Sequence, residues 1–138
     1  MKKICIVASK YYEDITDMLI DGANEAINNY KKKFKIKIIY VPGVFEIPYA
    51  VSKNLKKYDA FIVLGCVIKG ETPHFDFISK TTIDAIMRLS VENKKPIGNG
   101  ILTCFNKLQA IERADKLKRN KGKEATDAII KLLIGRNN

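Results

Sequence analysis

The feature that most constrains the fold is the apolar run FIVL, residues 61–64, near the start of the stretch Asp59–Asp76, DAFIVLGCVIKGETPHFD. A short apolar run bounded by charge and glycine predicts a strand buried on both faces, as in a parallel sheet. Thr72 and Pro73 then give a helix-start signal, a hydroxyl cap followed by proline at the first helical position. His74, the single histidine of the chain, is thereby placed just beyond the carboxyl end of a buried strand, where open α/β sheets bind ligands.

Alternating strand and helix patterns occupy the rest of the chain and are joined by short connections. This alternation predicts a parallel sheet covered by helices on both faces. We therefore expect an α/β protein, a flavodoxin-like three-layer α/β/α sandwich with a four-stranded parallel sheet, in which residues 1–138 form a single domain. Besides the central strand, the expected strands are Lys3–Ala8, Phe34–Val41 and Pro96–Cys104. The expected helices are Glu13 to about Asn29, a short helix that ends near Lys57, about Pro73–Glu92, Lys107 to about Leu117, and a final helix after Lys121-Gly122.

The last predicted strand, Pro96–Cys104, contains an Asn99-Gly100 pair that would locally favour a hairpin turn. The segments on either side of the pair are too short for two strands, so a continuous strand is the better interpretation. Its glycines then allow a ligand or a neighbouring backbone to approach closely. Asn106, followed three residues later by Gln109, resembles a capping box for the next helix.

Composition and charge argue against several classes of protein. An apolar share of 46% argues against disorder, and no apolar stretch reaches the length of a membrane span. The apolar part of the N-terminus is too short for a signal peptide. The net charge of +10 raises the question of nucleic acid, but it comes mostly from lysine, and no aromatic residues interleave the basic clusters. We therefore expect a solvated lysine surface and no nucleic-acid partner, while anionic small molecules are compatible with the charge.

The three cysteines, Cys5, Cys66 and Cys104, all lie in predicted strands. Their number is odd, no two form a CxxC pair, and one histidine is too few to complete a common zinc site with them. We interpret them as small buried residues in a reducing compartment, which predicts a cytoplasmic protein without a metal site.

His74 is the strongest candidate for chemistry, although a lone histidine often has a structural role. It follows Glu71 and Thr72 in a glycine-bounded loop rather than lying on an apolar face, which favours proton transfer. A helix N-terminus disfavours imidazolium and nearby carboxylates favour it, so the direction of any pKa shift stays open. Backbone N–H groups around Glu71 and Thr72 are suited to an anion. The segment from Gly65 to Gly70 only mimics a phosphate-binding loop, because Glu71 stands where that motif requires lysine.

Candidates for binding a ring or a phosphate follow the other strands. Phe45 beside Glu46 suits a flat, hydrogen-bonding heterocycle, although a core phenylalanine and a helix-capping glutamate explain the pair equally well. Tyr11, in the loop after the first strand, is a candidate second ring platform, and Asn99 offers the donor and acceptor that a uracil-like edge needs. Arg113 carries the planar fork that suits phosphate, with an ordinary surface arginine as the alternative.

Taken together, these segments resemble the lumazine synthase family from Lys3 to about Ile134. The most specific match is LGCVIKGETPHFD, residues 64–76, and VPGVFEIP, residues 41–48, is nearly as specific. Three further segments, PIGNGILT, AIERA and NKGKEA, follow in the family's order and spacing. Five collinear matches argue against coincidence.

The resemblance implies an enzyme that joins 5-amino-6-(D-ribitylamino)uracil to 3,4-dihydroxy-2-butanone 4-phosphate, releasing phosphate and water without a metal or organic cofactor. It implies a proton-transfer role for His74. It also implies three sets of substrate contacts. The pyrimidine and its ribityl chain would be contacted by Tyr11, Val44, Phe45, Glu46 and Asn99. The uracil substrate would be held, largely through backbone, by Cys66, Val67 and Ile68, and the phosphate-bearing substrate by Glu71, Thr72 and Arg113.

Some positions depart from the family's pattern. Tyr12 stands where asparagine is common, and Asp115–Asn120, DKLKRN, replaces a glycine-containing GTKAGN-like segment. Leu117 takes the place of a lysine, so no phosphate role is expected there. The resemblance implies a homo-oligomer with shared sites, and the short N-terminus favours a free pentamer over a sixty-subunit shell. The alternatives are an archaeal-type riboflavin synthase, which has a similar fold, and a flavin- or pterin-binding module without catalysis.

Overall fold

Four parallel strands form one sheet in the computed structural model, which describes residues 1–30 and 32–135. The prediction of a flavodoxin-like α/β/α fold with a four-stranded parallel sheet is confirmed. The strands lie in the order β2-β1-β3-β4. They are β1 (Lys2–Ser9), β2 (Phe34–Val41), β3 (Ala60–Ile68) and β4 (Ile97–Cys104). The helices are α1 (Glu13–Asn28), the 3-10 turn η1 (Val44–Glu46), α2 (Ile47–Asn54), α3 (His74–Asn93), α4 (Lys107–Ala114) and α5 (Lys121–Ile134).

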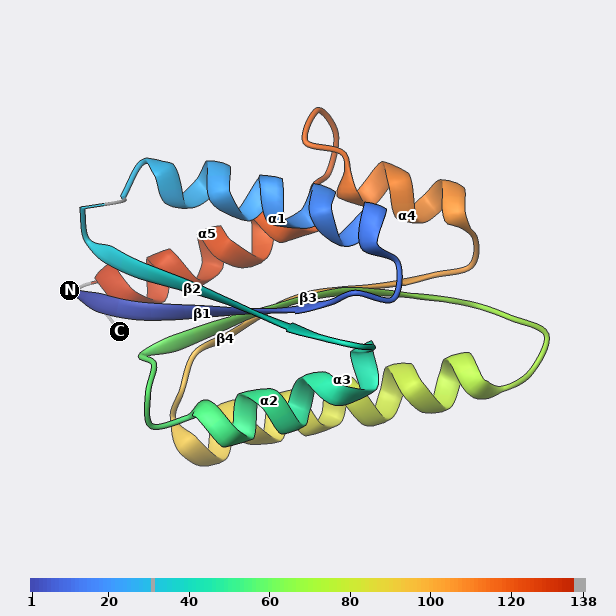
Figure 1. Ribbon diagram of the computed structural model, residues 1–138, viewed down its shortest axis with the longest axis horizontal. Coiled ribbons are helices and arrows are strands. Elements are labelled where there is room, and N and C mark those ends of the chain that lie inside the picture. Colours follow the sequence, from blue (N-terminus) through green and yellow to red (C-terminus); the bar gives the residue numbers. More distant parts are fainter. Residues whose placement is uncertain (31, 136–138) are drawn as a thin grey trace.

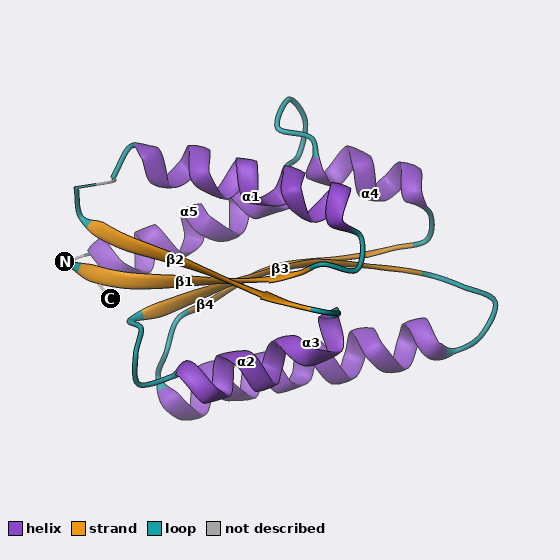
Figure 2. Ribbon diagram, in the orientation of Figure 1, coloured by secondary structure: helices purple, strands orange, loops and turns teal. Residues whose placement is uncertain are grey.

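Helices cover both faces of the sheet: α1, α4 and α5 lie on one face, and α2 and α3 on the other (Figure 1, Figure 2). The strands supply two cores because successive side chains point to opposite faces. Ile4 of β1 packs in the core beneath α1, α4 and α5, whereas its neighbour Cys5 packs toward α2 and α3. β3 lies inside the sheet and is buried from Ala60 to Cys66, as its apolar run predicts.

Two predicted helix ends are wrong by a few residues. α3 begins at His74, not at Pro73, since Pro73 is its N-cap residue. The Thr72 hydroxyl is therefore not the cap, and it accepts only a long hydrogen bond, 3.4 Å, from the His74 N–H. α2 ends at Asn54 rather than near Lys57, and the residues between them form turns.

The predicted cap of α4 is confirmed, but its predicted end is wrong. The Asn106 side chain accepts a hydrogen bond of 2.9 Å from the Gln109 N–H. The helix stops at Ala114, three residues before the expected Leu117. It stops because Asp115 adopts extended backbone and its carboxylate accepts a hydrogen bond from the Leu117 N–H, which begins a turn instead.

β4 runs without interruption through Asn99-Gly100, so the prediction of a continuous strand rather than a hairpin is confirmed. A Cβ atom built at Gly98 would lie 2.7 Å from the Ala125 carbonyl oxygen, and one at Gly100 would lie 2.4 Å from the Leu64 side chain. Glycine at these two positions therefore allows α5 and β3 to pack directly against β4.

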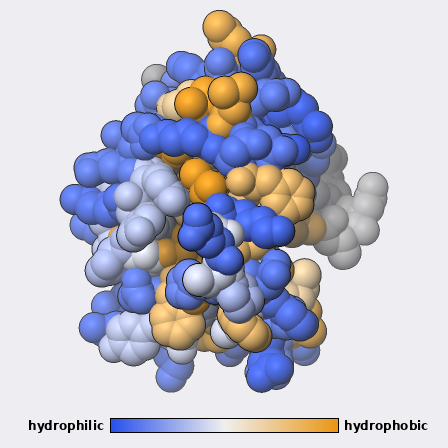
Figure 3. Space-filling model, turned by 90° about the vertical axis from the view of Figure 1, so that its right-hand side faces the viewer, coloured by the Kyte–Doolittle hydropathy of each residue, from blue (hydrophilic) through white to orange (hydrophobic). Residues whose placement is uncertain are grey.

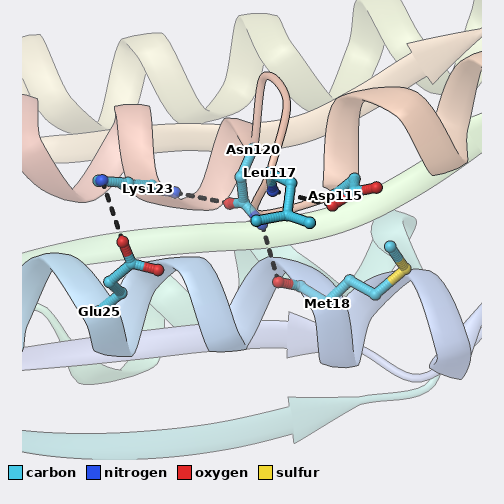
Figure 4. Close-up of polar contacts among 6 residues, drawn as sticks. All are labelled: Met18, Glu25, Asp115, Leu117, Asn120 and Lys123. Carbon is cyan, nitrogen blue, oxygen red and sulfur yellow. Dashed lines mark hydrogen bonds and ion pairs between the residues drawn. The ribbon is translucent and has the colours of Figure 1, made fainter.

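The buried side chain of Asn120 joins three helices (Figure 4). Its Nδ2 donates to the carbonyl of Met18 on α1 at 2.9 Å and to the carbonyl of Ala114 at the end of α4. Its Oδ1 accepts from the Lys123 N–H at 2.8 Å and so caps α5. Gly22 of α1 leaves room for it, since a Cβ there would lie 2.0 Å from the Asn120 Oδ1 atom. This junction fixes the segment that connects α4 to α5.

All three cysteines are buried and free, as the sequence predicts. Burial raises the pKa of the Cys5 and Cys66 thiols to about 12, so both are neutral near pH 7. In the ranges 1–30 and 32–135, no helix has both the length and the apolar character that crossing a membrane requires.

Candidate functional site

A cleft of about 430 Å³, the first cleft, lies at the carboxyl ends of β1, β2 and β3. Parallel strands end at one edge of their sheet, so the loops that follow them come together there. Figure 3 views this end of the molecule, where hydrophobic surface lies in patches between hydrophilic side chains. The first cleft is lined by Tyr11, Tyr12, Gly43, Val44, Phe45, Cys66, Val67, Ile68, His74 and Ile78.

Gly65 determines how the turn η1 sits in this cleft. A Cβ atom at Gly65 would lie 2.8 Å from the Val44 side chain and 3.1 Å from the Cβ of Ser9. Glycine therefore lets Val44 pack into the core against β3. With Val44 buried, the next side chain, Phe45, points outward and is 59% exposed. The interpretation of Phe45 as a core residue is thus wrong.

The first cleft has two exposed rings on separate loops. Tyr11 is 73% exposed and follows β1, whereas Phe45 follows β2. The Tyr11 ring meets the Tyr12 ring edge-on, with centroids 4.9 Å apart. Exposed aromatic faces beside an apolar floor suit a flat ring.

Tyr12 lies beside a charged pair that links α1 to α4. Lys107 lies 5.9 Å from the centroid of the Tyr12 ring and forms an ion pair of 3.0 Å with Asp14. The hydrogen bond from Lys107 lowers the pKa of the Asp14 carboxyl. Burial raises the pKa of the Tyr12 hydroxyl, which therefore stays neutral at physiological pH.

His74 is the titratable residue of the first cleft best placed for proton transfer. It is exposed, it occupies the first turn of α3, and it lines the cleft. The Cys66 thiol lines the same cleft, but it is buried and its raised pKa of about 12 makes it a poor nucleophile. Glu71 and Thr72 are exposed in the loop before His74 and do not line the cleft.

A second hollow, of about 450 Å³, lies along β4. Side chains from both faces of this edge strand line it, with α3 on one side and α4 and α5 on the other. Asn99 and Arg113 belong to this hollow and not to the first cleft. The Asn99 side chain accepts a hydrogen bond of 3.0 Å from the Ile101 N–H. The lining residues are Ile83, Asn99, Ile101, Leu102, Thr103, Arg113, Arg119, Lys121 and Glu124.

Within one chain the candidate residues therefore fall into two groups. The first cleft brings together Tyr11, Val44, Phe45, Cys66, Val67, Ile68 and His74. The second hollow holds Asn99 and Arg113, while Glu46, Glu71 and Thr72 line neither. Glu46 is the N-cap residue of α2, as the helix-cap interpretation has it, but its side chain makes no capping hydrogen bond.

Sequence reasoning did not assign several lining residues to the site. Tyr12 and Ile78 belong to the first cleft, and Arg119 and Lys121 to the second hollow. Tyr12 directly follows the candidate Tyr11, and this adjacent pair of tyrosines was a signal that Tyr12 also lies near the first cleft. Asn120, a cap residue just before α5, was a signal that its neighbours lie at the start of a helix.

In the part of the chain that the structure describes, no three or more His, Cys, Asp or Glu residues are grouped so that they could hold a metal ion. The groups available at the two sites are instead exposed rings, one imidazole and several cations. This set suits binding of a flat heterocycle, proton transfer and binding of an anion.

The fold and these sites define a class: a flavodoxin-like α/β protein with a cleft at the carboxyl ends of its strands that suits a small molecule. Comparison with known proteins then gives the family. Residues 1–135 match the family model of 6,7-dimethyl-8-ribityllumazine synthase. The chain is 41% identical over 134 residues to the 6,7-dimethyl-8-ribityllumazine synthase of Campylobacter jejuni, covering 95% of this chain and 87% of the relative. It is 42% identical over 135 residues to that of Aliarcobacter butzleri, covering 96% and 86%.

The chain belongs to the 6,7-dimethyl-8-ribityllumazine synthase family, whose members are transferases of riboflavin biosynthesis. The family and the enzyme class that the sequence motifs predict are confirmed. The relatives favour neither a riboflavin synthase nor a non-catalytic flavin-binding module. Membership of the family implies small-molecule substrates and an oligomeric assembly.

Proposed function

We propose that the chain condenses 5-amino-6-(D-ribitylamino)uracil with 3,4-dihydroxy-2-butanone 4-phosphate to form 6,7-dimethyl-8-ribityllumazine, phosphate and water. The observation that carries this proposal is the first cleft, where two exposed rings and the single imidazole face one space beside the matching family motifs. The pyrimidine would lie between Tyr11 and Phe45. Backbone groups of Cys66, Val67 and Ile68 would hydrogen-bond its edge.

The remaining candidate residues have proposed roles at the ribityl chain and the second substrate. Val44 and Glu46 would contact the ribityl chain and ring. Glu71 and Thr72 would face the butanone phosphate. Asn99 would contact the uracil substrate, and Arg113 would bind the phosphate.

The chemistry requires repeated proton transfer. The 5-amino nitrogen attacks the ketone to form an imine with loss of one water, phosphate is eliminated, and the ribitylamino nitrogen closes the ring onto the remaining carbonyl with loss of a second water. His74 would move protons in these steps, because its imidazole is exposed, lines the cleft and carries one nitrogen that accepts and one that donates a proton. Arg113 would stabilise the phosphate as it leaves. Holding both reactants together supplies a further part of the rate.

His74 and Arg113 line different hollows of one chain. We propose that a second copy brings its β4 and α4 side against the first cleft, so that both groups face one pair of substrates. A head-to-tail contact of this kind repeats around a closed ring, and a homopentamer is the assembly we propose. The free, buried cysteines fit a reducing compartment, and we propose a cytoplasmic location.

The decisive experiment gives the purified protein both substrates and follows lumazine by absorbance. We expect lumazine to form, and His74→Asn to lower kcat by roughly 10²-fold or more, the scale of general acid–base catalysis. Arg113→Ala should raise KM for the butanone phosphate, while Arg88→Ala, an exposed arginine of α3 outside both hollows, should change neither constant. Riboflavin formation from lumazine alone, or no product at all, would reject the proposal.

A complementation test addresses the sharing of sites between chains. The His74→Asn and Arg113→Ala variants are each purified, then unfolded and refolded together in equal amounts. If each site takes His74 from one copy and Arg113 from the next, roughly one quarter of the sites in a randomly mixed ring regain both groups. Activity that stays at the average of the two variants would show that one chain supplies both groups.

A further inference from the structure

Arg119 gives the second hollow another guanidinium beside Arg113. Arg113 comes from the last turn of α4, whereas Arg119 comes from the segment between α4 and α5. The Asn120 junction fixes this segment, because the buried Asn120 side chain bonds α1, α4 and α5 at once. Arg119, directly before Asn120, is therefore held by its backbone at a defined place although its side chain is exposed.

The electrostatics of the second hollow favour an anion. Arg113, Arg119 and Lys121 line it, and Glu124 is the single carboxylate among the lining residues. Lys121 is the first residue of α5, so the positive end of that helix also lies at the hollow. Among the residues described, none of the ion pairs involves these three cations or Glu124. Arg113 donates one weak hydrogen bond, 3.9 Å, to the Cys104 Sγ atom, which leaves its charge unpaired, so the three positive charges are available for an anionic ligand.

We propose that Arg119 is a phosphate-binding residue of this enzyme, which holds the phosphorylated substrate and the released phosphate together with Arg113. The proposal rests on the proposed function for the identity of the substrate. Two planar forks and one ammonium suit the several oxygens and the double negative charge of a phosphate monoester. Arg119 lies in the segment DKLKRN, residues 115–120, which connects α4 to α5.

The first test uses inorganic phosphate as the probe and needs no turnover. Phosphate is titrated calorimetrically into the full-length assembled protein and into Arg119→Ala. Loss of one charge-assisted contact should raise Kd for phosphate by roughly tenfold, and Arg119→Lys should recover part of the affinity. The matched control is Lys118→Ala, which removes the same charge from the adjacent exposed residue, outside the hollow.

Equal affinities of Arg119→Ala and Lys118→Ala for phosphate would overturn the proposal, as would a wild-type protein that binds no phosphate. Melting temperatures identify a variant that fails to fold, and Arg119→Gln then replaces Arg119→Ala.

Turnover separates this inference from the proposed function. Arg119→Ala should raise KM for the butanone phosphate by a similar factor, while KM for the pyrimidine stays within about twofold of wild type, because only ground-state binding of the phosphate is lost. If no lumazine forms but phosphate affinity still depends on Arg119, the proposed function fails and the anion site stands. If lumazine forms normally and Arg119→Ala changes neither Kd nor KM, the proposed function stands and Arg119 has no role in it.

Discussion

Replacing Asn120 with aspartate separates two roles of its side-chain amide, capping α5 and donating hydrogen bonds to neighbouring helices. The amide oxygen caps α5 through the Lys123 N–H, and the amide nitrogen donates to the carbonyls of Met18 and Ala114. Aspartate keeps the capping oxygen and is as good an N-cap as asparagine. It removes the donor at a site where the side chain is only 4% exposed, so the Ala114 carbonyl at the end of α4 loses its partner and the Met18 carbonyl, inside α1, keeps only its helical bond.

The expected loss follows from those two bonds. An unsatisfied buried polar group costs about 1–3 kcal/mol, and a carboxylate facing two carbonyls adds repulsion. A favourable interaction of the new charge with the start of α5 offsets about 0.3–1 kcal/mol. We therefore expect Asn120→Asp to lower the free energy of unfolding by about 3 kcal/mol at pH 7, which is roughly 10 °C in Tm for a chain of this size. The ion pair between Lys123 and Glu25 nearby is half exposed and contributes about 1 kcal/mol or less.

The matched control is Asn106→Asp. Asn106 caps α4 in the same way, through the Gln109 N–H, but it is exposed and its side-chain nitrogen has no bond of this kind. That substitution should change stability by no more than about 0.5 kcal/mol. Both variants are compared with wild type by urea titration and thermal scans at equal protein concentration, since assembly also contributes to stability. Equal and small effects of the two substitutions would falsify the reasoning.

The pH dependence gives a second check on Asn120→Asp. The buried carboxyl should have a raised pKa, and its protonated form can donate to one of the two carbonyls. The destabilisation should therefore be smallest below the ordinary carboxyl pKa of about 4 and grow as pH rises. A deficit that is constant from pH 4 to pH 7 would contradict this account.

Three further predictions concern the first cleft, the thiols and β4. Phe45→Ala should weaken binding of the pyrimidine substrate by roughly tenfold, the loss of one aromatic contact, with an unchanged Tm because the ring is 59% exposed; equilibrium binding and a thermal scan check both. Cys66, with its pKa raised to about 12, should resist iodoacetamide at pH 8.5 in the folded protein and react once unfolded. Its contribution to stability is complete below about pH 9 and is lost as pH rises toward 12. Gly98→Ala should cost about 2 kcal/mol or more, because its Cβ would meet the Ala125 carbonyl oxygen at 2.7 Å; an unchanged urea midpoint would refute that.

The sequence was sufficient for the fold because its main signals are local and agree with each other. The apolar run at 61–64 specified a buried strand, which is confirmed. Lysine alternates with apolar residues at Phe34–Val41, a pattern typical of an edge strand, and β2 does lie at an edge of the sheet. The end of α4 was not predictable in the same way. Helical spacing continues to Leu117, but a carboxylate-to-backbone bond at Asp115 and the Asn120 junction end the helix earlier.

The site was only partly predictable, because the rule that places ligands at strand ends says nothing about side-chain direction. Phe45 reaches the first cleft because Gly65 allows Val44, and not Phe45, to enter the core. That outcome depends on a contact between two segments about twenty residues apart. Arg119 was not predicted as a site residue for a similar reason, because its position depends on the contacts of its neighbour Asn120 with α1 and α4.

The position of the second hollow bears on how a complete site would arise. The hollow runs along β4, an edge strand of the sheet, and carries side chains from both faces of that strand. Edge strands leave backbone groups and side chains open to another chain. The first cleft, with its imidazole and rings, has no cation among its other lining residues, and the second hollow has cations but no ring. Each hollow therefore lacks what the other supplies, and a contact that places the β4 edge of one copy over the first cleft of the next would unite proton transfer with phosphate binding.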